Sequence, residues 1–171
     1  MIQTDMQQEL GRAKNALQNY LIHKLLIPKV YLDAEWNGEK VDVLAIDRAG
    51  SGDVHAVRMV LDENNGENII WNVLKNVRQF HSFSSHYRYV AAICGSPHSR
   101  QAHECYEENA IRESFAMDGV GRIGILYVDL TVDDPKVQVI LKAERFRSSK
   151  ELVEMADQFV AAHTANWEVR E

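Results

Sequence analysis

Cysteine, proline and basic side chains are all scarce in this chain of 171 residues. Two cysteines, Cys94 and Cys105, are too few for a disulfide framework, so we expect a reducing compartment and a cytoplasmic protein. Lys and Arg number 19 against 25 Asp and Glu, a net charge of −6. This balance excludes a strongly basic nucleic-acid binder but leaves room for a local basic groove. No apolar run approaches the roughly 18 residues that a membrane span needs, and we expect no membrane partner.

The overall composition is that of an ordinary globular protein. Hydrophobic residues make up 46% and charged residues 26%, so the chain can bury a core without a metal or a disulfide. The three prolines fall between periodic segments, and no Gly/Ser-rich linker or internal repeat divides the sequence. We therefore predict one domain over residues 1–171.

Hydrophobic periodicity predicts the first half of the fold. An amphipathic stripe from Met6 to Lys24 predicts a helix, which Pro28 ends. Three strands follow at 30–36, 40–47 and 53–61. The Asn37-Gly38 pair and the loop at 48–52 are tight connections, so these strands are expected to form an antiparallel meander.

The second half alternates helices with apolar strands. Helices are expected from the segment DENNGEN to about Phe83, over 99–117, and from the capping box of Ser148 and Glu151 onward. Strands are expected at 87–94, 121–130 and 136–146. The order α-β-β-β-α-β-α-β-β-α predicts an α/β fold with a mixed central sheet flanked by helices.

The second hairpin places an acid beside a guanidinium. With the loop at 48–52, cross-strand partners sum to 100, so Leu44 faces Ala56 and Asp42 faces Arg58. Directly opposed side chains lie about 5 Å apart at Cβ. Because a half-buried charge is costly unless it is paired, we expect an ion pair between Asp42 and Arg58.

The order of elements around Asp42 resembles a nuclease family. A helix, a three-stranded meander, a helix and a strand, with an Asp starting the second strand, is similar to the core of PD-(D/E)XK, or restriction-endonuclease-like, nucleases. The resemblance covers residues 10–95 and implies an α-β-β-β-α-β core with C-terminal additions. In that family the Asp and an acid on the next strand bind a divalent metal, a Lys on that strand helps to activate water, and a Glu on the first helix often joins them.

The family's catalytic pattern is only partly present here. Asp42 in VDVLAID matches the metal-binding Asp, but Arg58 stands where the second acid is expected and Val60 where the Lys is expected. The first-helix Glu is replaced by Lys14. A single carboxylate among cations makes a poor cage for Mg²⁺, which prefers several hard oxygen ligands. The resemblance thus implies a degenerate site without a cofactor, in a protein that binds nucleic acid or protein partners as a scaffold.

An active enzyme with a migrated site is the alternative. Some members of the family take an acid or the Lys from a neighbouring element, which would make this chain a Mg²⁺- or Mn²⁺-dependent DNA endonuclease. Glu35 is the candidate acid nearest to Asp42 in the first hairpin. Further candidates are Asp62, Glu63, Glu67 and Lys75.

One local cluster of basic residues is a candidate for contact with nucleic acid. Arg145, Arg147 and Lys150 lie close together around Phe146. The competing interpretation is a solvated strand end beside a helix cap. A homodimer is a further expected partner if the sheet has an exposed edge strand.

The Cys and His residues after the fourth strand do not form a known zinc motif. Cys94, His98, His103 and Cys105 follow the spacing C-x3-H-x4-H-x-C, which differs from established fingers. Cys94 ends an apolar strand and is expected in the core. We expect no metal at these residues.

Overall fold

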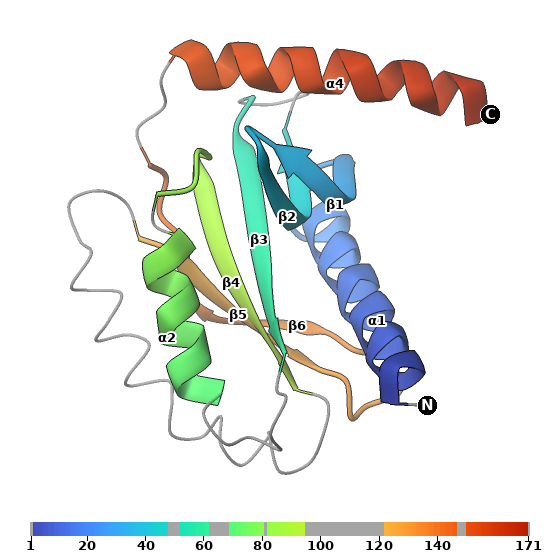
Figure 1. The fold of residues 1–171 in the computed structure, drawn as a ribbon, viewed down its shortest axis with the longest axis vertical. Helices are drawn as coiled ribbons and strands as arrows, with labels where there is room; N and C mark the ends of the chain where they lie inside the picture. Colours follow the sequence, from blue (N-terminus) through green and yellow to red (C-terminus); the bar gives the residue numbers. More distant parts are fainter. Residues whose placement is uncertain are drawn as a thin grey trace.

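The computed structural model describes residues 2–47, 52–61, 69–80, 82–94, 122–146 and 150–170 (Figure 1). The helices are α1 (Ile2–His23), α2 (Ile69–Phe80) and α4 (Lys150–Arg170). The strands are β1 (Lys29–Trp36), β2 (Glu39–Ile46), β3 (Val54–Leu61), β4 (Tyr87–Cys94), β5 (Gly124–Asp129) and β6 (Val137–Leu141). The helix expected at 99–117 lies outside the described residues. None of the described helices is long and apolar enough to cross a membrane.

The strands form one six-stranded sheet in the order β1-β2-β3-β4-β5-β6. The first three strands are an antiparallel meander, β3, β4 and β5 run parallel, and β6 returns antiparallel to β5. The prediction of an α/β fold with a mixed sheet flanked by helices is therefore confirmed.

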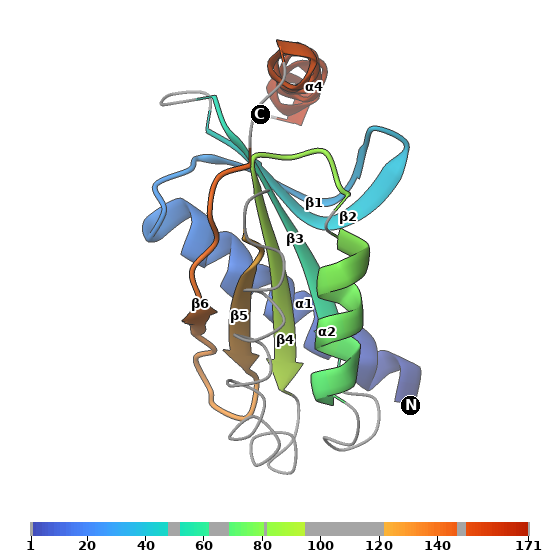
Figure 2. The same cartoon turned by 90° about the vertical axis from the view of Figure 1, so that its left-hand side faces the viewer.

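Helices cover both faces of the sheet (Figures 1 and 2). Leu17 and Leu21 of α1 pack against Val43 and Val57 on one face. On the opposite face, α2 and α4 pack against side chains of β1 to β4 in a second core, in which Phe80 is 1% exposed. Because both faces are buried, β4 has seven buried residues in a row.

The two hairpins fix the register of the first three strands. Asn37 and Gly38 have φ angles of 52° and 79°, the left-handed backbone that a two-residue hairpin turn needs. In the second hairpin the structure pairs Leu44 with Ala56, which confirms the predicted register. The ladder between β2 and β3 ends at Val43, one residue before Asp42 reaches its partner position.

Both strands of the first hairpin contain an irregularity at the same level. Tyr31 and Ala34, three residues apart, contribute to the same core, whereas strict alternation would place them on opposite faces. On β2, Val41 and Leu44 are also three residues apart and also contribute to this core. The residues in between include Asp33, which has a φ of 52°, and Asp42. The irregularity therefore brings two acidic residues to one level of the sheet.

Candidate functional site

Asp42 hydrogen-bonds to the main chain of β3. Its Oδ2 accepts a hydrogen bond from the amide of Met59 at 2.7 Å, at the level where the regular ladder has stopped. Burial raises the pKa of Asp42, and the negative charge of Asp33 adds to that effect. The Met59 amide, Lys14 and Arg58 act in the opposite direction. The carboxylate thus holds β2 and β3 together where their backbones no longer bond.

Lys14 reaches Asp33 across the α1 face of the sheet. Its Nζ lies 2.7 Å and 2.9 Å from the two carboxylate oxygens of Asp33. The Lys14 side chain is 18% exposed and that of Asp33 is 65% exposed, so water screens this pair. Lys14 is therefore engaged with an acid on β1.

The expected ion pair between Asp42 and Arg58 is wrong. The guanidinium carbon of Arg58 lies 5.0 Å from the centroid of the Phe80 ring, a cation–π contact on the α2 side. Among the charges that act on the pKa of Asp42, Arg58 is the weakest. The cause is local, because the β2–β3 ladder ends before these two residues and the Asp42 carboxylate turns to the Met59 amide instead.

Asp33 is a site residue that the sequence reasoning missed. Glu35, the candidate in the same strand, is exposed and stands opposite Lys40. The charged groups that act on the pKa of Asp42 are Lys14, Asp33 and Arg58. The sequence does contain a signal for Asp33, because the Asn37-Gly38 turn fixes a register in which Asp33 and Asp42 stand at opposed positions.

Most of the migrated-site candidates lie outside the described residues. This applies to Asp62, Glu63 and Glu67, whereas Lys75 is an exposed residue of α2. The described part of the chain contains no group of three or more His, Cys, Asp or Glu side chains that could hold a metal ion. Cys94 is buried, as expected for a core residue, and His98, His103 and Cys105 lie outside the described residues.

The predicted basic cluster is described only at Arg145. Its Nη2 and Nε lie 2.9 Å and 3.1 Å from the two oxygens of Asp53, a bidentate ion pair with a carboxylate that is almost fully buried. Arg147 and the side chain of Lys150 lie outside the described residues. The guanidinium of Arg145 is thus paired with Asp53, although its side chain is 43% exposed, and its predicted contact with nucleic acid stays a prediction.

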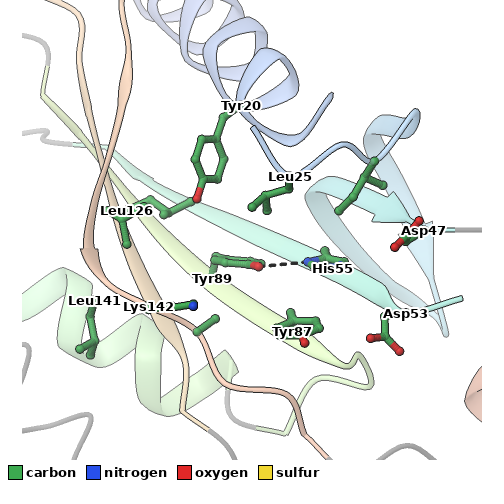
Figure 3. Close-up of a pocket in the computed structure, with 13 residues that line it drawn as sticks. Tyr20, Leu25, Asp47, Asp53, His55, Tyr87, Tyr89, Leu126, Leu141 and Lys142 are labelled. Atoms are coloured by element: carbon green, nitrogen blue, oxygen red, sulfur yellow. Dashed lines mark hydrogen bonds between the residues drawn. The ribbon is translucent and has the colours of Figure 1, made fainter. Parts of the chain in front are cut away.

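A cavity of about 420 Å³ lies between the end of α1 and the sheet (Figure 3). None of its residues was a candidate from the sequence. Polar and aromatic side chains supply much of its wall, namely Tyr20, Asp47, Asp53, His55, Tyr87, Tyr89 and Lys142. Apolar residues of β5, β6 and the segments beside them complete it. Such a mixed lining around a concave space is typical of small-molecule sites.

His55 is the most unusual side chain in this cavity. It is 8% exposed, its ring stacks on Tyr87 at 4.5 Å between centroids, and its Nδ1 lies 3.0 Å from the Tyr89 hydroxyl. Burial lowers the pKa of His55 to about 4, although Asp53 and Asp47 oppose the shift. The imidazole is therefore neutral near pH 7.

His86 lies next to the buried acid of this cavity, Asp53. Its Nδ1 accepts a hydrogen bond from the amide of Val54 at 2.8 Å, which leaves the proton of the neutral ring on Nε2. Nε2 lies 3.8 Å from Oδ1 of Asp53. Burial lowers the pKa of His86, so the ring is neutral and Arg145 supplies the charge that compensates Asp53.

Comparison with known proteins identifies a fold and no activity. No family model matches the sequence, and no curated protein matches it. A solved structure of a protein of unknown function from Silicibacter pomeroyi is similar, with a TM-score of 0.53 and 12% sequence identity. The match covers 93% of this chain and 86% of that chain. At this identity the likeness supports the α/β architecture alone.

Proposed function

We propose that this chain is a restriction-endonuclease-like scaffold that has lost metal-dependent cleavage and acts as a binding module. The order α1, β1, β2, β3, α2 and β4, with an antiparallel meander followed by a parallel strand, supports the core expected from the resemblance. Asp42 of β2 is the residue that the resemblance matches to the family's metal-binding acid.

The engagement of Asp42 by the Met59 amide carries this proposal. One carboxylate oxygen already accepts a main-chain hydrogen bond, and burial raises the pKa of the group. The position of the second acid is Arg58, whose cation lies against Phe80, and the position of the Lys is the buried Val60. This set of donors does not fit a Mg²⁺ or Mn²⁺ ion, which needs several oxygen ligands.

A metal-dependent DNA endonuclease with a migrated site is the second candidate. Asp33 acts on the pKa of Asp42, and Lys14 acts on it as well, so two acids and a lysine gather from β1, β2 and α1. Acids and a lysine are also the residue types of the family's active site, but there they come from different elements of the fold. Against this candidate, the Lys14 ammonium contacts both oxygens of Asp33 and would compete with a metal for them.

Cleavage assays separate the two candidates. The full chain is incubated with supercoiled plasmid and with single-stranded DNA in the presence of Mg²⁺ or Mn²⁺, beside the variants Asp42→Ala and Asp33→Asn. Glu35→Gln is the matched control, because Glu35 is an exposed acid on the same strand as Asp33. We expect intact DNA in every lane. Metal-dependent cleavage that both site variants abolish and the control retains would establish the migrated site.

The same DNA substrates identify the class of partner. A gel shift that weakens with added salt supports nucleic acid, since phosphate contacts release counterions. The absence of a shift would leave a protein partner as the occupant of this scaffold. Both outcomes are compatible with loss of cleavage. The gel shift therefore tests the class of partner independently of the cleavage activity.

A further inference from the structure

The cavity beside His55 is a separate place from the Asp42 site. Asp47 lies at its edge, five residues along the chain from Asp42, or about 16 Å at the rise of roughly 3.3 Å per strand residue. Figure 3 shows Tyr20 of α1 projecting toward the sheet on one side and Asp47 and Asp53 on the other. An occupant of this cavity would not touch Asp42, so the inference does not depend on the proposed function.

Among the described residues, the charges around the cavity nearly cancel. Two carboxylates, Asp47 and Asp53, belong to its wall, and Arg145 neutralises Asp53 through two hydrogen bonds. Lys142 adds one positive charge at the rim. Since His55 is neutral near pH 7, the local balance favours an uncharged ligand over an anion or a cation.

The wall offers nearly parallel rings. His55 and Tyr87 stack with an interplanar angle of 9°, and Tyr89 is inclined by only 12° to His55 at 5.9 Å. These side chains come from β3 and β4, where His55 and Tyr87 are Cα partners in the parallel ladder. Aromatic side chains held in this way are suited to contact a flat ring by stacking or by its edge.

Polar groups that can recognise the edge of such a ring are also present. Nδ1 of His55 is held by the Tyr89 hydroxyl, and no hydrogen bond within the described part of the chain engages Nε2. His55 is more than nine-tenths buried and belongs to the cavity wall. The Asp47 carboxylate adds an acceptor, because a carboxylate offers about four lone-pair positions. A neutral imidazole and a carboxylate together match a ligand that carries both donors and acceptors.

We propose that this cavity binds an uncharged planar nitrogen heterocycle with donors and acceptors on one edge, which is the chemistry of a nucleobase. The ring packs among His55, Tyr87 and Tyr89, and its polar edge bonds to the His55 imidazole and the Asp47 carboxylate. The volume of about 420 Å³ is within the range of small-molecule pockets and accommodates one base with its sugar. The base belongs either to a free nucleoside or to a single nucleic-acid strand.

Calorimetric titration of the full chain tests the site. The probes are guanosine, adenosine, cytidine and uridine, and in a second arm a short single-stranded DNA of mixed sequence. Asp47→Asn removes the charged acceptor at a half-exposed position, and His55→Phe removes Nε2 while keeping a ring. Tyr87→Leu removes the stacking partner of His55. Val153→Ala, at a 42% exposed position of α4, is the control outside the cavity.

We expect binding that Asp47→Asn weakens about tenfold, the size of a lost charge-assisted hydrogen bond. His55→Phe and Tyr87→Leu weaken it as well, and Val153→Ala leaves it unchanged. Binding of DNA but not of nucleosides, with the same pattern of variants, supports the proposal and assigns the base to a strand. If no probe binds, or if Asp47→Asn and Tyr87→Leu bind as the wild type does, the proposal is overturned.

Discussion

Gly124 of β5 has no Cβ atom, which allows the chain just after β6 to pack closely against β5. A Cβ added at Gly124 would lie 2.8 Å from the Cβ of Ala143 and 3.0 Å from the Tyr89 ring. We expect Gly124→Ala to lower the free energy of unfolding by about 1–3 kcal/mol through overpacking. Urea denaturation measures the change. Gly11→Ala is the matched control, because its site on α1 is open and the helix should gain up to about 1 kcal/mol.

The stability of the protein should depend on pH through His55. Its pKa is about 4 in the folded protein against 6.5 in the unfolded chain, so the unfolded state binds a proton first as the pH falls. The stabilisation is complete above pH 6.5 and is lost toward pH 4, by roughly 3 kcal/mol. Urea denaturation at pH 7, 6 and 5 measures this slope. His55→Phe should reduce it and leave the part that comes from His86, whose pKa is also lowered by burial. An unaltered slope in His55→Phe would contradict the assignment.

At the scale of single residues, the sequence predicted positions better than contacts. The cross-strand register beside Asp42 was predicted correctly, whereas the role of Asp42 itself stays a prediction. The pairing of Asp42 with Arg58 failed, because periodicity does not report where a ladder ends. Asp33 could have been found from the Asn37-Gly38 turn, but its φ of 52° is unusual for an aspartate and has no sequence signal.

Among the elements, α4 is fixed to the first hairpin by aromatic contacts. Phe159 meets the rings of Tyr31 and Trp36 edge to face at 4.9 Å and 5.6 Å. In Figure 1 this helix lies across one end of the sheet, next to β1 and β2. The burial of β1 therefore depends in part on α4, which lies more than a hundred residues further along the chain.

Removal of the Phe159 ring should loosen this attachment. We expect Phe159→Ala to lower the free energy of unfolding by about 2–4 kcal/mol, since it deletes a partly buried ring and its aromatic pairs with Tyr31, Trp36 and His163. Val153→Ala on the same helix, 42% exposed, should change it by less than about 1 kcal/mol. Denaturation followed by tryptophan fluorescence measures both variants. Equal effects would show that α4 does not pack as described.

Local signals predicted the elements well where they were strong. The Asn37-Gly38 turn, the stripe of α1 and the apolar run of β4 each correspond to an observed element. The stripe of α4 also predicted a helix, yet nothing in it indicated that Tyr31 and Trp36 would receive Phe159. The cavity was missed for the same reason, because its residues come from separate strands and from α1 and meet only in the folded chain.

At the scale of the whole molecule, the sheet has two edges, β1 and β6. Exposed edge strands are a common route to association between copies of a chain. Val139 of β6 is 44% exposed, which adds apolar surface at that edge. The predicted homodimer stays a prediction, and sedimentation of the purified chain would measure it.

Calorimetric titration with Mn²⁺ tests the central claim most directly, which is that the family's metal site has been lost. The wild type is compared with Asp42→Asn and Asp33→Asn, and Glu35→Gln serves as the control. We predict no saturable heat from any of the four proteins, because the Asp42 carboxylate is held by the Met59 amide and Lys14 is held by Asp33. Saturable Mn²⁺ binding that Asp42→Asn and Asp33→Asn abolish, and Glu35→Gln retains, would contradict the account and favour a working nuclease.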